Sequence, residues 1–361
     1  MCTTLFTLTA CGGSDGKVYD LNAQIEDLTK QINEANDKIA TLEAEKNNLA
    51  AENSNLKEEN SNLKEENEEL KVWVEALRNC LKDIHNYVDG FCTTCGKEDE
   101  SELAYTRDGD YIYFGEYPQT IKADDVTITD TIDDRGYYLG SDGFFYAKVT
   151  GNPLSSTYTF STGTTITSGT VYYFKVEPIR WRILSEENGV AFILCDSIIA
   201  NLRYAVYSNN YVESEIRAWL NSTFYDTAFS ELARSIILVT EVDNSALSAG
   251  YSDCEYACEN TNDKIFLLSF KEATNKAYGF DSTYAEDSAR RMLTSDYSKA
   301  TGAFTSTSLD YYGTGYWWLR SPHGLKSSTA KEIDYLGRAN SSARESNTKS
   351  WGVVPALRIT L

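Results

Sequence analysis

A seven-residue repeat of leucine runs through the N-terminal part of the chain and constrains its fold more than any other feature. The repeat comprises Leu21, Leu28, Leu42, Leu49, Leu56, Leu63, Leu70 and Leu77, with Ala35 filling the one gap. Three residues before each of these positions lies a second series, Val18, Ile25, Ile32, Ile39, Lys46, Asn53, Asn60, Asn67 and Val74. These are the d and a positions of a coiled coil. The repeat predicts a helical stalk over residues 18–88.

The residues at the a positions indicate how many helices associate. β-Branched residues at a with leucine at d favour two parallel strands, and an Asn at a is best satisfied by the same Asn of a partner helix. Asn53, Asn60 and Asn67 supply three such layers, so we expect a parallel, in-register homodimer. At about 1.5 Å per residue the stalk is on the order of 100 Å long. The alternative is a solvated single helix.

The first residues carry a signal for membrane attachment. Leu8-Thr9-Ala10-Cys11 follows a short apolar run and resembles the lipobox of bacterial lipoproteins. The resemblance implies a signal peptide over 1–10, a lipid on Cys11, a flexible tether over 11–17 and a place on the extracellular face of a Gram-positive cell membrane. The alternative is a chance cysteine. No other stretch approaches the roughly 20 apolar residues that span a bilayer, so the lipid is the expected anchor.

Four residues with metal-ligating side chains follow the heptads, namely Cys80, His85, Cys92 and Cys95. The stretch HNYVDGFCTTCGK resembles short knuckles in surface proteins of anaerobic Gram-positive bacteria. Two thiolates in a C-x-x-C-G turn point the same way and suit a soft metal such as zinc. A disulfide between two Cys80 side chains of a dimer and reduced thiols are the open alternatives. In each case residues 89–100 are expected to form a compact hinge.

Beyond residue 100 the composition becomes that of β-strands. Most of the 25 Tyr fall here and alternate with Val, Ile or Thr. We expect strands at Tyr111–Thr120, Val171–Leu184, Val190–Ala200, Tyr316–Pro322 and Gly352–Leu361. Helices are expected to begin at Ser214 and to cover Ala228–Ile237 and Ser288–Thr294, and a strand from Asp263 should run into another helix. These elements predict one α+β head over 101–361.

Four ordered motifs in this head resemble an uncharacterised family of bacterial extracellular domains. They are SEIRAWLN, DKIFLLS, YWWLRSP and VPALRI, and the resemblance covers residues 111–361. The family is similar to the C-type-lectin-like fold shared with formylglycine-generating enzymes. The resemblance therefore implies two helices packed on twisted antiparallel sheets. The whole chain would then be an α+β head of C-type-lectin-like type on a long parallel coiled coil.

The resemblance does not carry the chemistry of either relative. Formylglycine-generating enzymes use a late cysteine pair, whereas this chain has no cysteine after Cys258. A calcium lectin site needs clustered Glu, Asn and Asp oxygens, such as an E-P-N motif, and none is present. Cys254 and Cys258 are spaced for a small loop disulfide or remain reduced thiols, and Cys195 is expected to be a buried apolar residue.

Catalytic motifs and a nucleic-acid-binding face are both missing from the sequence. The head contains no G-x-S-x-G, H-E-x-x-H or P-loop, so we predict no catalytic residue. A hydrolase with two acids of separated pKa is the alternative. The formal net charge of −21 opposes nucleic acid as a partner, because phosphate binding needs an Arg/Lys face.

A polar segment between Pro322 and Trp351 is the expected ligand-facing surface. In the C-type-lectin-like fold this last segment usually faces the ligand, so by resemblance the contact candidates are His323, Lys326, Tyr335, Arg338, Asn340, Arg344 and Asn347. Such side chains suit recognition of an extracellular protein or glycan, and a dimeric stalk would add avidity. An ordinary solvated hairpin is the alternative for this segment. A structural spacer between membrane and wall is a further alternative for the whole chain.

Overall fold

The computed structural model describes residues 15–82, 87–88, 91–95, 104–339 and 344–361. The chain divides into two compact units, Met1–Leu81 and Lys82–Leu361. The predicted lipid site Cys11, the candidate ligand His85 and the contact candidate Asn340 lie outside the described residues.

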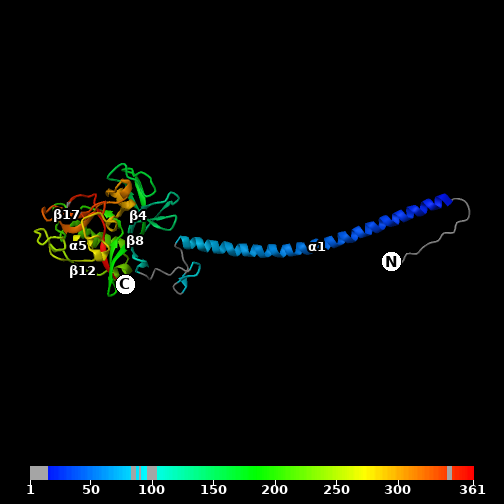
Figure 1. Ribbon diagram of the computed structural model, residues 1–361, viewed down its shortest axis with the longest axis horizontal. Coiled ribbons are helices and arrows are strands. Elements are labelled where there is room, and N and C mark those ends of the chain that lie inside the picture. The colour runs from blue at the N-terminus through cyan, green and yellow to red at the C-terminus, as the bar shows by residue number, and fades with distance from the viewer. Residues whose placement is uncertain (1–14, 83–86, 89–90, 96–103, 340–343) are drawn as a thin grey trace. The chain divides into compact units, whose positions relative to one another are not determined.

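The first unit contains one long helix, α1 (Asp15–Leu81), of 67 residues (Figure 1). It confirms the predicted N-terminal helix, but the helix ends before Val88, where the sequence analysis had placed its end. Instead, β1 (Tyr87–Val88) pairs antiparallel with β2 (Phe91–Cys92). Tyr and Val favour strands, and the Asp-Gly sequence between the paired strands is a strong signal for a two-residue hairpin turn. Local strand and turn preference therefore overrides the heptad pattern at this point.

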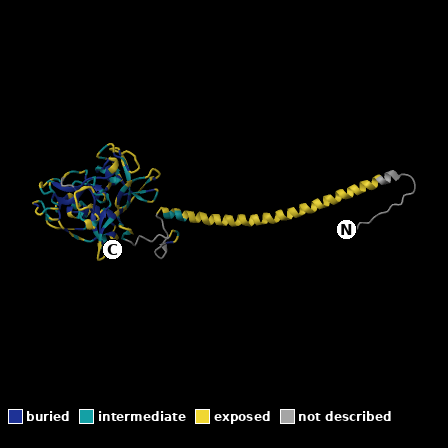
Figure 2. Ribbon diagram, in the orientation of Figure 1, coloured by how far each residue is buried: buried dark blue, intermediate teal, exposed yellow. Residues whose placement is uncertain are grey.

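The apolar stripe of α1 is exposed along the helix (Figure 2). Seven leucines at d positions, from Leu21 to Leu70, are between 47% and 60% exposed. A continuous row of half-exposed leucines on one helix is a surface suited to a partner. No described helix is long and apolar enough to cross a membrane.

The second unit is a β-rich head with two principal sheets. The larger sheet is antiparallel and has nine strands, with the order β14-β20-β9-β8-β7-β6-β5 and with β4 pairing both β8 and β3. Its strands are β3 (Thr106–Asp108), β4 (Tyr111–Ile121), β5 (Ile128–Ile132), β6 (Tyr138–Gly140), β7 (Phe145–Thr150), β8 (Val171–Glu187), β9 (Val190–Cys195), β14 (Ile265–Phe266) and β20 (Ala356–Thr360).

The smaller sheet has five strands in the order β11-β19-β16-β17-β18. It consists of β11 (Ala200–Asn201), β16 (Trp317–Pro322), β17 (Thr329–Ile333), β18 (Arg344–Glu345) and β19 (Gly352–Val353). β16 and β19 run parallel, and the other neighbours are antiparallel. Two short pairs complete the strands, β10 (Ser197–Ile198) with β15 (Leu293–Thr294), and β12 (Thr240–Val242) with β13 (Thr261–Asp263).

Short helices lie between these strands. They are α2 (Glu215–Trp219), η2 (Leu220–Phe224), α3 (Tyr225–Ala228), α4 (Glu231–Ile236), α5 (Phe270–Ala273), η3 (Lys276–Tyr278), η4 (Ser288–Arg290), α6 (Asp296–Thr301) and η5 (Leu309–Tyr311). The predicted helix start is confirmed, because the Ser214 side chain caps α2 by accepting from the Arg217 amide. The helix predicted over Ala228–Ile237 covers only Glu231–Ile236 in the structure. The Ser230 side chain accepts from the Ala233 amide and so caps the start of this helix, α4. Only one turn, η4, forms in the predicted Ser288–Thr294 helix before β15.

Two of the sequence motifs contact each other through polar side chains. Arg217, in SEIRAWLN, forms an ion pair of 2.7 Å with the buried Asp263, which opens DKIFLLS. Asn221 donates to the Ile265 carbonyl at 2.8 Å and accepts from the Lys264 amide at 2.9 Å. These contacts fix the helical segment to β13 and β14, so both motifs serve the architecture of the head.

The third motif lies in the main hydrophobic core. Trp317 and Trp318 of β16 are fully buried, and their indole nitrogens donate to the carbonyls of Arg290 (3.0 Å) and Leu202 (2.9 Å). The paired donors allow two large amphipathic rings to be buried without unsatisfied polar atoms. This core supports β17 and β18, where the polar segment lies.

Candidate ligand-binding site

The predicted polar segment forms the edge of the five-stranded sheet. Arg344 lies on β18 opposite Ala330 of β17. Lys326, Arg338 and Asn347 are exposed to solvent. The remaining described candidates, His323 and Tyr335, are half-buried.

A loop at one end of this edge, residues 323–328, is held in shape by a buried amide. The Asn209 side chain is 2% exposed. Its Nδ2 atom donates to the carbonyls of His323 (3.4 Å), Lys326 (2.9 Å) and Thr329 (2.9 Å). Because the backbone is fixed in this way, side chains such as Lys326 are displayed from a preorganised loop.

Four aromatic side chains gather at the other end of the edge and form what we term the aromatic platform: Tyr311, Tyr316, Tyr335 and Trp351. The ring centroids of Tyr311 and Tyr335 are 6.0 Å apart, those of Tyr335 and Tyr316 are 5.5 Å apart, and Tyr316 stacks on Trp351 at 4.5 Å. The three tyrosines are half-buried and Trp351 is buried. The rings therefore form a connected row with partly exposed tyrosines.

Three arginines border this platform, and each is close to a carboxylate. The Arg344 guanidinium lies 4.4 Å from the Trp351 ring centroid, and Arg291 lies 4.9 Å from that of Tyr311. Their acidic neighbours are Glu332, 4.0 Å from Arg344, and Glu286, 3.5 Å from Arg291. Arg338 pairs with Asp334 at 2.7 Å. The border of the platform thus offers hydrogen-bond donors and acceptors side by side.

A buried acid, Glu332, supports the platform from below. Its carboxylate accepts a hydrogen bond from Nε1 of Trp351, and the residue is 3% exposed. Burial raises the pKa of Glu332 to about 7, although the Trp351 hydrogen bond and the Arg344 charge act in the opposite direction. The carboxyl therefore changes charge near neutral pH while it is hydrogen-bonded to the indole nitrogen of Trp351.

This arrangement has the chemistry of a site for a polar ring-shaped ligand. Partly exposed aromatic rings supply contact area at low cost in conformational entropy, and guanidinium and carboxylate groups offer hydrogen bonds to hydroxyl groups. The Glu332 carboxyl is covered by Trp351 and is not placed to contact a substrate.

The sequence predicted some of the residues in the platform and its border. The structure brings its candidates Tyr335, Arg338 and Arg344 together, whereas His323 and Lys326 belong to the loop held by Asn209. Sequence reasoning missed the platform residues Tyr311, Tyr316 and Trp351, the acid Glu332 and the anchoring Asn209. Aromatic clustering in the sequence was visible for the first two, because both lie within the run DYYGTGYWW.

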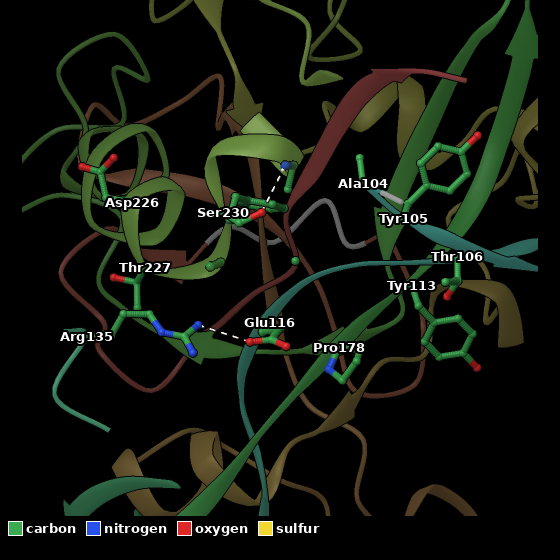
Figure 3. A pocket seen from close by; sticks show the side chains of 14 residues that line it. Ala104, Tyr105, Thr106, Tyr113, Glu116, Arg135, Pro178, Asp226, Thr227 and Ser230 are labelled. Carbon is green, nitrogen blue, oxygen red and sulfur yellow. Dashed lines mark hydrogen bonds and ion pairs between the residues drawn. The ribbon is translucent and has the colours of Figure 1, made fainter. Parts of the chain in front are cut away.

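Several cavities lie elsewhere on the described part of the head. One, of about 700 Å³, is lined by Asn201, Arg203 and Lys349 among others. Another, of about 440 Å³, lies between β3, β4 and the turn from α3 to α4 (Figure 3). The first is adjacent to the platform in sequence, since Ser350 lines it and precedes Trp351.

The predicted metal ligands divide between the two units. Cys80 lies near the end of α1 in the first unit, and Cys92 and Cys95 lie in and just after β2 in the second. A zinc ion shared by these cysteines stays a prediction.

The other predicted cysteine pair is not bonded in the structure. Cys254 and Cys258 carry free thiols. Cys258 packs against the main core, while Cys254 is close enough to Lys331 to influence its pKa. A loop disulfide under oxidising conditions stays a prediction. Cys195 is fully buried, and burial raises the pKa of its thiol to about 12, which makes it inert.

Part of the head is similar to one family of known sequences. Residues 188–361 match the model of a domain of unknown function, DUF6273. The matched residues contain all four motifs, the five-stranded sheet and the aromatic platform, but begin after β8. No curated protein and no solved structure matches the chain.

Proposed function

We propose that this chain is a lipid-anchored extracellular binding protein, attached to the membrane through Cys11, dimerised through α1 and carrying a head that recognises a glycan or a protein. The observation that carries the proposal is the aromatic platform, with Arg344 over the Trp351 ring and the Glu332 carboxylate at the indole nitrogen. The head is further proposed to be related to the C-type-lectin-like fold, which its antiparallel sheets and short flanking helices support.

A glycan is the ligand that the platform favours. Apolar faces of sugar rings pack on aromatic side chains, and sugar hydroxyls both donate and accept hydrogen bonds. The partly exposed pair Arg291 and Glu286 at the border presents both functions. The exposed Arg338 and Arg344 add further donors. Because the cations are matched by acids, the border carries little excess charge, which suits a neutral sugar.

Dimerisation through α1 would present two heads from one site of attachment. The seven half-exposed d leucines and the Asn layers at a support a parallel pair. Two linked heads bind a repetitive polymer with higher avidity than one head. This is the advantage that a long stalk would add on a cell surface.

The proposal is tested by binding the delipidated chain, stalk included, to arrays of glycans and cell-wall polymers. Tyr335→Ala and Arg344→Ala should each weaken binding about tenfold, equivalent to about 1.4 kcal/mol. Arg107→Ala is the matched control, because Arg107 is similarly exposed and pairs with Glu186 at 2.7 Å away from the platform. Unchanged binding by both platform variants would reject the site.

A structural spacer is the second candidate, favoured by the 67-residue length of α1. It predicts that removal of whole heptads abolishes function while platform substitutions have no effect. Absence of binding to every polymer would favour it. A hydrolase is not proposed, because Glu332, the one carboxylic acid among the described residues with a raised pKa, is buried and hydrogen-bonded to the Trp351 indole.

We also propose that Cys80, Cys92 and Cys95, with His85 as the fourth ligand, hold a structural zinc ion. Cobalt substitution tests this, because thiolate-bound Co²⁺ gives intense charge-transfer absorption. Cys95→Ser should abolish that absorption, and Cys258→Ser, outside the cluster, should retain it. A metal-free protein whose Cys80 side chains are linked in the dimer would instead establish the disulfide alternative.

A further inference from the structure

The cavity of about 440 Å³ shown in Figure 3 plays no part in the proposed function. Its volume is that of a small-molecule site. Strands β3 and β4 form one side, and the turn between α3 and α4 forms the other (Figure 3). The cavity therefore belongs to the larger sheet, whereas the aromatic platform lies on the smaller one.

The floor of this cavity is formed by an irregularity in β4. The register between β4 and β8 shifts between Tyr113 and Glu116, and Gly115 adopts a φ of +65°. A Cβ atom at Gly115 would lie 2.6 Å from the Phe229 ring and 2.8 Å from the Ala228 carbonyl oxygen. Only glycine permits this close approach, and the bulge changes the direction of the side chain that follows.

Acidic and aromatic side chains line the cavity around this floor. Tyr113 and Glu116 come from β4 and Tyr105 lies just before β3, whereas Asp226 comes from α3 on the other side (Figure 3). The two carboxylates are 50% and 65% exposed, so a ligand can reach both.

One cation, Arg135, also lines the cavity, but it is shared between two acids. It lies 3.3 Å from Glu116 and 3.0 Å from Asp133, which is outside the cavity. Asp226 is also paired, with Arg234 at 3.5 Å, which is outside the cavity as well. These three acids and two arginines together keep a net negative charge. An ammonium group is attracted both to carboxylates and to tyrosine rings.

We propose that this cavity binds a small ligand that carries a protonated amine. The carboxylate of Glu116 takes the ammonium group, the tyrosine rings pack on the adjoining apolar part of the ligand, and the Gly115 bulge sets the direction of the Glu116 side chain. Ion pairs at such exposed positions contribute about 1 kcal/mol or less, so a millimolar dissociation constant is expected.

Saturation-transfer NMR on the full-length chain tests this with two nearly isosteric probes, benzylamine and benzyl alcohol. Benzylamine should bind saturably and benzyl alcohol should bind about threefold more weakly. Glu116→Gln should weaken benzylamine binding about threefold. Glu186→Gln is the matched control, because Glu186 is also a partly exposed glutamate paired with an arginine but lies outside the cavity.

The results separate this site from the platform. Loss of benzylamine binding in Glu116→Gln with retention in Tyr335→Ala supports the proposal. Equal binding of the two probes, unchanged binding by Glu116→Gln, or no saturable binding of benzylamine overturns it. None of these outcomes affects polymer binding by the platform, which is measured separately.

Discussion

The indole Nε1 of Trp351 donates a hydrogen bond to the buried carboxylate of Glu332 across the strand that separates them. In the five-stranded sheet, β16 lies between β17, which carries Glu332, and β19, which Trp351 precedes. The bond therefore ties a platform ring to an acid two strands away. The charge of Glu332 and the position of Trp351 are consequently linked.

This link predicts a pH-dependent stability. The pKa of Glu332 is about 7 in the folded chain against an ordinary 4.5, so the folded state holds the proton more tightly than the unfolded state. The contribution of Glu332 to folding stability is fully present below its ordinary pKa of 4.5. It is lost as the pH rises through the pKa of about 7 that Glu332 has in the folded chain. A shift of this size corresponds to about 3 kcal/mol.

Glu332→Gln should remove this dependence while keeping an acceptor for Trp351. We expect the variant to exceed the wild type in melting temperature above neutral pH, with the difference shrinking as the pH falls towards the ordinary glutamate pKa. Calorimetry across this range measures the difference. Parallel pH profiles for the two proteins would show that Glu332 is not the titrating group.

Asn209 should control the stability of the loop 323–328. Asn209→Ala leaves the carbonyls of Lys326 and Thr329 without their buried donor, which costs about 1–3 kcal/mol. Denaturant unfolding and hydrogen exchange of the loop measure this. Asn210→Ala removes one acceptor, for the Val212 amide at 3.0 Å, and should cost less. Equal effects would contradict the anchoring role of Asn209.

Alanine substitutions at Gly109 and Gly115 distinguish two ways in which an added side chain destabilises the fold, backbone strain and overpacking. Both have positive φ, +65° and +56°, but a Cβ at Gly109 meets nothing within 4 Å whereas one at Gly115 meets Phe229 at 2.6 Å. Gly109→Ala should therefore cost about 1 kcal/mol from backbone strain. Gly115→Ala should cost about 1–3 kcal/mol more through overpacking. Equal melting temperatures for the two variants would disprove the tight approach of β4 to Phe229.

The sequence predicted those parts of the fold that depend on local pattern. The heptads predicted α1, and the apolar run Trp317–Leu319 predicted a core strand, because both signals are periodic or continuous. The predicted end of the helix at Val88 was wrong, because the strand preference of Tyr87–Val88 and the turn preference of Asp89-Gly90 compete with the heptad signal.

The candidate site was predicted only in part because it depends on pairing between distant strands. Arg344 and Tyr335 were found by polarity and position. Trp351 was treated as flanking core, and Glu332 as part of the polar segment, since nothing local indicates that β16 brings them together. Asn209 lies more than 110 residues from the carbonyls that it holds, and no local pattern reports such a contact.

The Asn layers of α1 give the last prediction. In the single chain the side chains of Asn60 and Asn67 donate to carbonyls one turn earlier, at 2.9 and 3.0 Å, as an unpaired amide does. In a parallel dimer these amides would face their copies, which specifies register at a cost in stability.

Changing Asn53, Asn60 and Asn67 together to Ile should therefore raise the melting temperature of the stalk and populate trimers or higher oligomers, measured by sedimentation equilibrium. The triple change Glu58→Gln, Glu65→Gln and Lys64→Gln, at positions outside a and d, is the control and should remain dimeric. If the wild-type chain sediments as a monomer at every concentration, α1 is a solvated single helix and the dimeric presentation of the head is wrong.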